Sequence, residues 1–482
     1  MKGMKKIYVT ILIIAIPIQI FAWTIPINIS RTQQRSNEPA IAIDRWGRIH
    51  VVWEDFQTHP VVVRGDILYR QKDGIFWGEI INISHDSLTE AWTPKIAVDT
   101  FGYPHVVWEE FVYGTRNKIY YSFFDGKSWS APISLSDSLL QGNSKAKWAD
   151  IAIDQKNRIH LVWQDAITGY TEVYYAMYDG DHWSTPLNLS NNPNGAVIPK
   201  IAIDGQNHLH VVWCNYGDFW ELDSVEIYYS KFDGDSWTTP VNISRSPKQS
   251  YYPNIAIGPD DNPHVVWEER KRGYTIYYSF YDGSSWSMPH SLDSLTGESG
   301  YLPDLVVDQQ NNVHIVWGGE SPALWYVFYN GMSWSSPCDL SIAASVNALI
   351  PDITVDHTNC LHLVWTEVID YIHHISDIYY SKQQLTGIEE YQGPSLTYSA
   401  LSFLSNPFTK TTTVKFTLPY ETKVSLRIYD TSGRIVSALI NDGREAGHHT
   451  ITWDVGDLPS GIYFARLDTD NFTCTRKLIL IR

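Results

Sequence analysis

The stretch Pro94–Ser136, PKIAVDTFGYPHVVWEEFVYGTRNKIYYSFFDGKSWSAPISLS, sets a pattern that most of the chain repeats. Its most regular marker is a His followed by two aliphatic residues and a Trp, as in His105–Trp108. The marker occurs seven times, 48 to 55 residues apart, with the histidines at His50, His105, His160, His210, His264, His314 and His362. A period near fifty residues with several short strands in each unit is typical of a β-propeller, in which each repeat forms one blade.

Each repeat predicts four strands. The first is short and apolar, as in Lys95–Val98, the second contains the His-to-Trp marker, and the third contains a Tyr pair such as Tyr120-Tyr121. An Asp-Gly hairpin signal such as Asp125-Gly126 leads to the fourth strand, which starts with Trp and usually carries a Pro three residues later. Because Pro cannot donate to a strand ladder, we expect the fourth strand at the outer edge of its blade.

The tight turn before each marker starts with Asp in six repeats, as at Asp99, and its fourth residue is Gly, Asn or Asp. These residue types cap a type I turn and tolerate a left-handed backbone. We therefore interpret the turn aspartates as structural. The seven histidines are interpreted in the same way, as packed and hydrogen-bonded core residues.

The ends of the repeat region predict how the fold closes. The seventh repeat stops after its third strand at Ser381, whereas the chain provides an unassigned fourth strand at Trp23–Ser30. The two fragments complete each other. The prediction is an all-β fold with a seven-bladed propeller over residues 23–382, closed by its N-terminal strand.

The N-terminus predicts export. Residues 1–22 have three early lysines, an apolar run and Ala22 as a plausible cleavage point, which is typical of a signal peptide; a retained membrane anchor is the alternative. No later segment is long and apolar enough to span a bilayer. The net charge of −17 argues against nucleic acid as a partner.

Residues 383–396 are predicted to be a linker, and residues 397–482 a second domain. Its strands alternate between apolar and polar residues, as in Thr412–Leu418, Lys423–Tyr429 and Ile462–Leu467. Short alternating strands separated by glycine turns favour a small Ig-like β-sandwich.

This second domain resembles the C-terminal sorting domain of type IX secretion. The resemblance rests on Asn406-Pro-Phe408, Ile428-Tyr-Asp430, Trp453-Asp454, Gly461-Ile-Tyr-Phe464 and the final Lys477–Arg482. It implies the type IX secretion machinery as a partner, passage across the outer membrane, and release or attachment at the cell surface. An Ig-like domain with only a structural role is the alternative.

The repeats resemble the bacterial neuraminidase repeat, or sialidase-like, superfamily. Ser230–Trp237 departs from the Asp box of that family, because its Asp and Gly are adjacent. A sialidase also needs three carboxylate-binding arginines, a Tyr-Glu pair and an acidic Asp, and the sequence assigns none of these. The resemblance therefore implies a fold, and no catalytic residue is predicted.

One candidate binding set lies two residues after each marker Trp, on the face with long, variable loops. It comprises Asp55, Glu110, Asp165, Asn215, Glu269 and Glu367, with Gly319 in the sixth repeat. Such a ring of acceptors suits sugar hydroxyls or a cation such as calcium. Local hydrogen bonding that fixes the adjacent loop is the alternative.

A second candidate set consists of aromatic residues that the repeat does not explain. They are Trp92, Trp148, Trp220, Tyr251 and Tyr301, all predicted on the variable face. Aromatic faces beside carboxylates are what neutral sugar rings need. Covering the rim of the core is the alternative role for each of them.

The leading hypothesis is a secreted or cell-surface propeller that binds extracellular glycan or protein without catalysis. A sialidase-like glycoside hydrolase or lyase is an alternative, with Glu110 and Glu269 as a possible carboxylate pair. A structural surface or adhesion module is another. No cofactor other than calcium is suggested, and Cys214, Cys338, Cys360 and Cys474 lack metal-ligand spacing.

Overall fold

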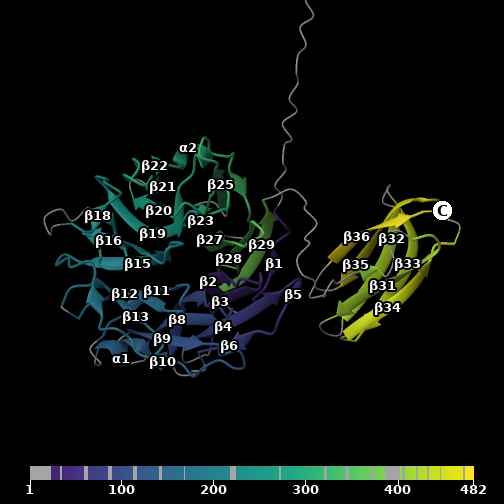
Figure 1. The fold of residues 1–482 in the computed structure, drawn as a ribbon, viewed down its shortest axis with the longest axis horizontal. Helices are drawn as coiled ribbons and strands as arrows, with labels where there is room; N and C mark the ends of the chain where they lie inside the picture. The colour runs from purple at the N-terminus through teal and green to yellow at the C-terminus, as the bar shows by residue number, and fades with distance from the viewer. Residues whose placement is uncertain are drawn as a thin grey trace, which may run out of the picture. The chain divides into compact units, whose positions relative to one another are not determined.

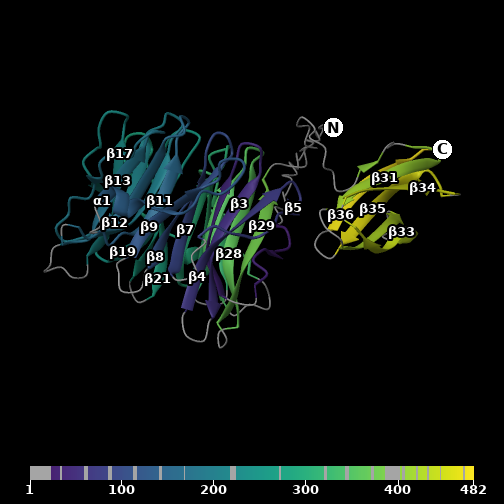
Figure 2. The same ribbon diagram turned by 90° about the horizontal axis from the view of Figure 1, so that it is seen from below.

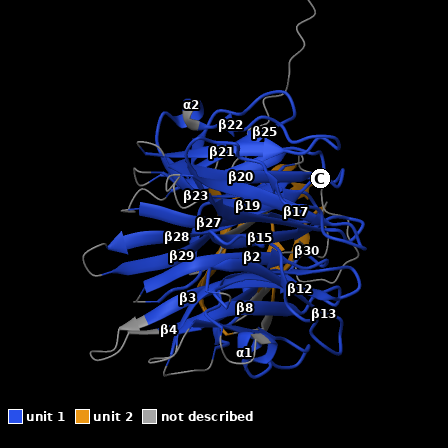
Figure 3. Cartoon of the chain, turned by 90° about the vertical axis from the view of Figure 1, so that its left-hand side faces the viewer, with its two compact units in different colours: residues 1–71, 77–389 blue, residues 72–76, 390–482 orange. Residues whose placement is uncertain are grey.

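The computed structural model describes residues 23–481 except for 33–34, 59–62, 85–88, 112–116, 141–143, 168, 218–223, 271–272, 320–322, 342–346, 371–373, 386–401, 404–407, 419–421, 431–433, 446, 457 and 470–472. It has two compact units, one of residues 1–71 and 77–389 and one of residues 72–76 and 390–482 (Figure 3). The predicted signal peptide and most of the predicted linker lie outside the described residues. The described chain is almost entirely β-structure, as predicted.

Within each repeat the strands pair antiparallel in the order of the sequence. Two short parallel pairings, Arg35 with Ser376 and Gly65 with Glu90, join the first, second and last repeats into one 13-stranded sheet. The first three repeats contain β2 (Arg35–Ile43), β3 (Ile49–Thr58), β4 (Val63–Asp73), β5 (Phe76–Trp77) and β6 (Ile81–Asn82); β7 (Glu90–Val98), β8 (Pro104–Phe111), β9 (Asn117–Phe123) and β10 (Ile133–Ser134), followed by the helix α1 (Leu135–Leu140); and β11 (Lys147–Ile153), β12 (Ile159–Asp165), β13 (Glu172–Tyr178) and β14 (Leu187–Asn188).

The next repeats follow the same plan. They contain β15 (Ala196–Ile203), β16 (Leu209–Tyr216), β17 (Val225–Phe232) and β18 (Val241–Asn242); β19 (Gln249–Ile257), β20 (Pro263–Arg270), β21 (Tyr274–Phe280) and β22 (His290–Ser291), followed by α2 (Asp293–Thr296); β23 (Gly300–Val307), β24 (Val313–Gly319), β25 (Leu324–Tyr329) and β26 (Cys338–Asp339); and β27 (Asn347–Val355), β28 (Cys360–Asp370) and β29 (Ile375–Gln384).

The sheets lie around a common centre (Figure 1). The first strand of each repeat contacts the first strand of the next, and β27 contacts β2, so the first strands form a closed ring. Figure 2 shows the strands of neighbouring sheets running alongside one another. The predicted outer position of the fourth strand agrees with its pairing, because each fourth strand pairs only with the third.

The N-terminal segment completes the sheet of the last repeat. The strand β1 (Ile27–Asn28) pairs with β29, with Ile27 opposite Tyr380. Next to it, the Ile29 amide donates to the Ile378 carbonyl at 2.8 Å. The beginning and the end of the repeat region are thus joined in one sheet.

The core lies between adjacent sheets. The seven marker tryptophans are at most 1% exposed. One cluster, for example, packs Val212 and Ile227 of one sheet against Val265 and Trp267 of the next. Apolar burial of this kind therefore holds each sheet to its neighbour.

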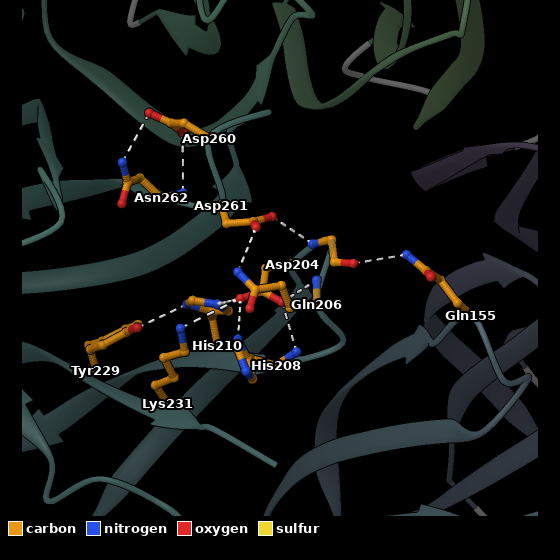
Figure 4. A network of polar contacts seen from close by, with 11 residues as sticks. Gln155, Asp204, Gln206, His208, His210, Tyr229, Lys231, Asp260, Asp261 and Asn262 are labelled. Atoms are coloured by element: carbon orange, nitrogen blue, oxygen red, sulfur yellow. Dashed lines mark hydrogen bonds and ion pairs between the residues drawn. The ribbon is translucent and has the colours of Figure 1, made fainter.

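An Asp–His–Tyr arrangement fixes the turn before the marker in the six repeats whose turn starts with Asp, as Figure 4 shows for the fourth repeat. Asp204 accepts the backbone amides of Gln206 and His208 through Oδ1, at 2.9 and 2.8 Å. Its Oδ2 lies 3.2 Å from His210 Nε2, and His210 Nδ1 lies 2.9 Å from the Tyr229 hydroxyl. These contacts confirm that the marker histidines and turn aspartates are structural.

The turns of neighbouring sheets are also hydrogen-bonded to each other. The Gln155 amide donates to Asn207 Oδ1 at 3.0 Å, and the Gly205 amide donates to Asp261 Oδ1 at 2.8 Å. Asn207 and Asp261 have φ values of 65° and 62°. The left-handed position predicted in each turn therefore also joins one repeat to the next.

The buried histidines make stability depend on pH. Burial lowers the pKa of His160, His210 and His264 to about 4, although a nearby aspartate opposes the shift in each case. In the unfolded chain the imidazoles bind a proton at pH values near 6.5, where the folded protein does not. We expect stability to be full above pH 6.5 and to fall as the pH is lowered towards 4.

NMR titration of the protein labelled at its histidines would test this expectation directly. Three imidazole signals, those of His160, His210 and His264, should titrate near pH 4. Titration of all histidines near pH 6.5 would contradict the burial argument.

The C-terminal unit contains two sheets. One has the order β30 (Ser402–Phe403), β31 (Thr411–Leu418), β34 (Gly447–Asp454), and the other β33 (Ile435–Arg444), β32 (Thr422–Asp430), β35 (Gly461–Thr469), β36 (Thr473–Leu480). Residues of both sheets, among them Val414, Phe416, Leu426 and Leu467, form one buried cluster. The three strands predicted from alternation lie within β31, β32 and β35.

Candidate functional site

Every first strand contains a bulge on the inner side of the ring. The ladder between first and second strands shifts register at this point, for example between Trp92 and Lys95. One residue in each bulge has φ between 47° and 55°, and none of these is glycine: Glu38, Thr93, Trp148, Ile198, Tyr252, Leu302 and Ile350. A left-handed backbone at non-glycine residues is strained, and such strain is found most often at functional sites.

Side chains of the preceding repeat hold several of these bulges. The acceptors stand one residue after the marker Trp. The Trp148 amide donates to Glu109 Oε1 at 2.7 Å, and the Ile198 amide donates to Gln164 Oε1 at 2.9 Å. Glu54 and Glu268 accept the amides of Thr93 and Leu302 in the same manner. Contacts between repeats therefore maintain the strained conformation.

The seven bulge residues line a cavity of about 190 Å³. The remaining lining residues are Pro39, Pro94, Lys95, Ala149, Pro199, Lys200, Pro253, Asn254, Pro303 and Pro351. The backbone geometry repeats around this cavity, but the chemistry does not. An acid, a hydroxyl, two aromatic and three aliphatic side chains occupy equivalent positions. The sides of the cavity therefore differ in polarity and shape.

Charged residues stand two positions after the bulge residues. These positions hold Ala40, Lys95, Asp150, Lys200, Asn254, Asp304 and Asp352. The aspartates accept backbone amides of neighbouring repeats, as Asp150 does from Ile201 at 3.0 Å and Asp304 from Ile353 at 2.6 Å. Lys95 Nζ lies 3.9 Å from Asp352 Oδ2.

We call the charged residues of the first strands near the cavity the inner ring, and three of its carboxyl groups have raised pKa values. Burial, with the nearby Asp352 carboxylate, raises the pKa of Asp304 to about 8. Burial likewise raises the pKa of Asp352 to about 6 and that of Glu38 to about 7, although Lys95 opposes both shifts. Several carboxyl groups of this region therefore change charge near neutral pH.

The predicted acceptors two residues after the marker Trp lie inside the sheets. Asp55, Glu110, Asp165, Glu269 and Glu367 are at most 4% exposed, and Asn215 is partly buried. Trp108 Nε1 donates to Glu110 at 3.2 Å, Trp213 donates to Asn215 in the same way, and Trp365 donates to Glu367. Ser144 donates to Asp165 at 2.5 Å. These contacts match the local structural alternative, and the predicted ligand-binding role remains a prediction.

The predicted aromatic residues do not form one group. Trp148 lines the cavity and packs edge-on against Tyr252, with 6.0 Å between ring centroids. Trp92 is 42% exposed and packs on Phe56.

The two predicted tyrosines lie beside other groups. The Arg270 guanidinium lies 4.3 Å from the centre of the Tyr251 ring. Tyr301 packs edge-on against Tyr274, with 6.3 Å between ring centroids. Trp220 lies outside the described residues. Of the four described aromatics, only Trp148 lines the cavity.

One group of side chains has the spacing of metal ligands within the described part of the chain. One ligand atom each from Asp356, Cys360 and His362 lies within 4.8 Å of the others. Sulfur and nitrogen donors do not suit calcium, which prefers oxygen. Cys214, Cys338 and Cys360 are free thiols.

Sequence reasoning missed most cavity residues, including Glu38, Lys95, Lys200 and Tyr252. A signal was present, because Pro follows the bulge residue in six of seven repeats. Pro inside a strand lacks a ladder donor and marks a bulge or an edge. The residue before each of these prolines was therefore recognisable as irregular.

The C-terminal unit matches a known family. Residues 405–481 match the secretion system C-terminal sorting domain. The predicted resemblance to the type IX sorting domain is confirmed. The protein is accordingly secreted or displayed at the cell surface. Among the described residues, no helix has the length and apolar character needed to cross a membrane.

Solved structures resemble the chain in fold at low sequence identity. A protein of unknown function from Dyadobacter fermentans is 10% identical over 76% of this chain and 99% of its own, with a TM-score of 0.48. The GH93 α-L-arabinofuranosidase of Fusarium graminearum is 12% identical over 63% of this chain and 96% of its own, with a TM-score of 0.47.

A fungal alcohol oxidase of the AA5 family, in complex with copper, is 11% identical over 96% of this chain and 100% of its own, with a TM-score of 0.50. Identities this low concern the fold alone. No curated protein matches the chain.

Proposed function

We propose that residues 23–382 form a seven-bladed β-propeller that, after export and removal of the signal peptide, binds extracellular glycan without catalysis. The repeat count, the closed ring of first strands and the N-terminal strand in the last sheet support the propeller. The two packed sheets of the sorting domain support an Ig-like sandwich for residues 397–482.

The observation that carries the binding proposal is the cavity within the ring. Trp148 and Tyr252 offer aromatic faces, Ile198 and Leu302 offer apolar walls, and Asn254 offers an amide. Sugar rings are bound by stacking on aromatic faces together with a few placed polar groups. The strained backbone at the lining residues is consistent with a preformed site.

Trp148→Ala is expected to weaken glycan binding roughly tenfold or more, because it removes the largest aromatic face of the cavity. The measurement is retention of the full mature chain on an immobilised glycan array, followed by titration with the best ligand. Trp46→Ala is the matched control, because Trp46 is 51% exposed and lies in a turn outside the cavity lining. Equal retention of the Trp148 variant and the wild type would contradict the proposed site.

A glycoside hydrolase or lyase is the second candidate, and Glu38 favours it. This carboxyl group lines the cavity, and its pKa of about 7 is in the range of a general acid. The same array tests this candidate by measuring released sugar. If sugar is released and Glu38→Gln abolishes the release, the hydrolase or lyase replaces the binding-only proposal. If the protein is not retained and no sugar is released, a structural module is favoured.

A further inference from the structure

Lys200 differs from the other charged residues of the inner ring. Its side chain lines the cavity. Among the described residues, no carboxylate oxygen lies within 4.0 Å of its Nζ atom, and the ammonium has no hydrogen-bond partner. Lys95, also in the lining, has one distant partner, Asp352 at 3.9 Å.

The aspartates of the inner ring are engaged elsewhere. Asp150 accepts the Ile201 amide, and Asp304 accepts both the Ile353 amide and the Asn254 side chain, the latter at 2.5 Å. None of the three aspartates belongs to the cavity lining, whereas both lysines do. The cavity therefore presents two ammonium groups and the Glu38 carboxyl group, while the three aspartates lie outside its lining.

Placing Lys200 in this position is costly. Burial and the neighbouring Lys95 ammonium lower the pKa of Lys200, although the more distant carboxylates of Asp150, Asp352 and Asp304 oppose the shift. An ammonium group removed from water needs a compensating partner, and two like charges make the cost larger. The repeat does not require a lysine at this position, because Ala40 and Asn254 occupy equivalent positions in other repeats. A bound anion would compensate both lysines.

Resting on the proposed glycan binding, we propose that Lys200 and Lys95 bind the carboxylate of an acidic saccharide, of the hexuronate class, in the cavity. The aromatic wall of Trp148 and Tyr252 would contact the sugar ring, and the two ammonium groups would contact its carboxylate. Glu38 is the carboxyl group that shares the lining, and with a pKa of about 7 it is partly neutral at neutral pH. The cavity is thus suited to an amphipathic anion.

The test is calorimetric titration of the full mature chain with an oligogalacturonate and with its neutral methyl ester. We expect the acid to bind at least roughly tenfold more tightly than the ester. Lys200→Gln should remove this preference, and Lys200→Arg should retain most of it. Lys127→Gln, in an exposed turn, is the matched control and should change nothing.

The outcomes separate this inference from the proposed function. Equal binding of acid and ester would overturn the carboxylate site and leave glycan binding intact. Binding of neither would overturn both. Inorganic sulfate that binds as tightly as the oligogalacturonate would also overturn the inference, since a free anion would then suffice. Unchanged thermal unfolding of Lys200→Gln would confirm that the variant is folded.

Discussion

Replacing Ile29 by Ala is expected to lower the free energy of unfolding of the repeat unit by about 2–5 kcal/mol. Ile29 is fully buried and belongs to the core cluster that contains Trp53 and Ile378. It follows β1, the strand that joins the start of the repeat region to its last sheet. The substitution therefore weakens the packing between the N-terminal segment and the last sheet, which closes the ring.

Ile27→Ala is the matched control for ring closure. Ile27 belongs to β1 but is 37% exposed, so its truncation should cost about 1 kcal/mol or less. Urea unfolding followed by tryptophan fluorescence would measure both variants. Similar midpoints for the two would mean that the N-terminal segment contributes little to closure.

Much of the repeat architecture could be predicted because periodicity shows directly in a sequence. The marker, the Tyr pairs and the Asp-Gly turns each predict one part of a sheet, and all three recur. The first strands were predicted too short. Lys95–Val98 was expected, whereas β7 runs from Glu90 to Val98. Pro94 suggests a strand boundary, but the strand continues past it through a bulge.

The position of the acceptors illustrates a limit of sequence reasoning. Successive side chains of a strand point to opposite faces of the sheet. Residues two after the marker Trp therefore share its face, and Glu110 accepts the Trp108 indole. Residues one after the Trp point the other way, and Glu109 holds Trp148 of the next repeat. Choosing between these faces required knowing where the neighbouring sheet lies.

The cavity was not predicted, although the Pro that follows six of the seven bulge residues marks these positions as irregular. Glu38, Trp148 and Lys200 are far apart in the chain, and only the closed ring brings them together. Glu38 and Trp148 also have a left-handed backbone, which the sequence does not suggest, since side chains with a Cβ atom disfavour that conformation. The aromatic criterion did select Trp148, which is the predicted site residue that reaches the cavity.

Replacing Asp204 by Ala is expected to lower the free energy of unfolding by about 1–3 kcal/mol, since removing a buried acceptor leaves its donors unsatisfied. Asp204 is 3% exposed. Through Oδ1 it caps the turn, and its Oδ2 lies 2.7 Å from His208 Nδ1 and 3.2 Å from His210 Nε2 (Figure 4). No other described carboxylate lies within 4.0 Å of these imidazoles, so the alanine variant leaves the buried Nε2 atom of His210 without an acceptor.

The controls for Asp204 separate charge from turn geometry. Asp204→Asn keeps an oxygen for the backbone amides of Gln206 and His208 but removes the charge, so an intermediate loss is expected. Asp235→Ala removes an exposed aspartate from a nearby hairpin and should change stability little. Urea unfolding at pH 7.5 would compare the variants, at a pH where His210 is neutral in both states. If Asp204→Ala unfolded at the wild-type midpoint, the repeated Asp–His–Tyr arrangement would not stabilise the sheets. The seven-fold recurrence of the marker histidine would then need a reason other than stability.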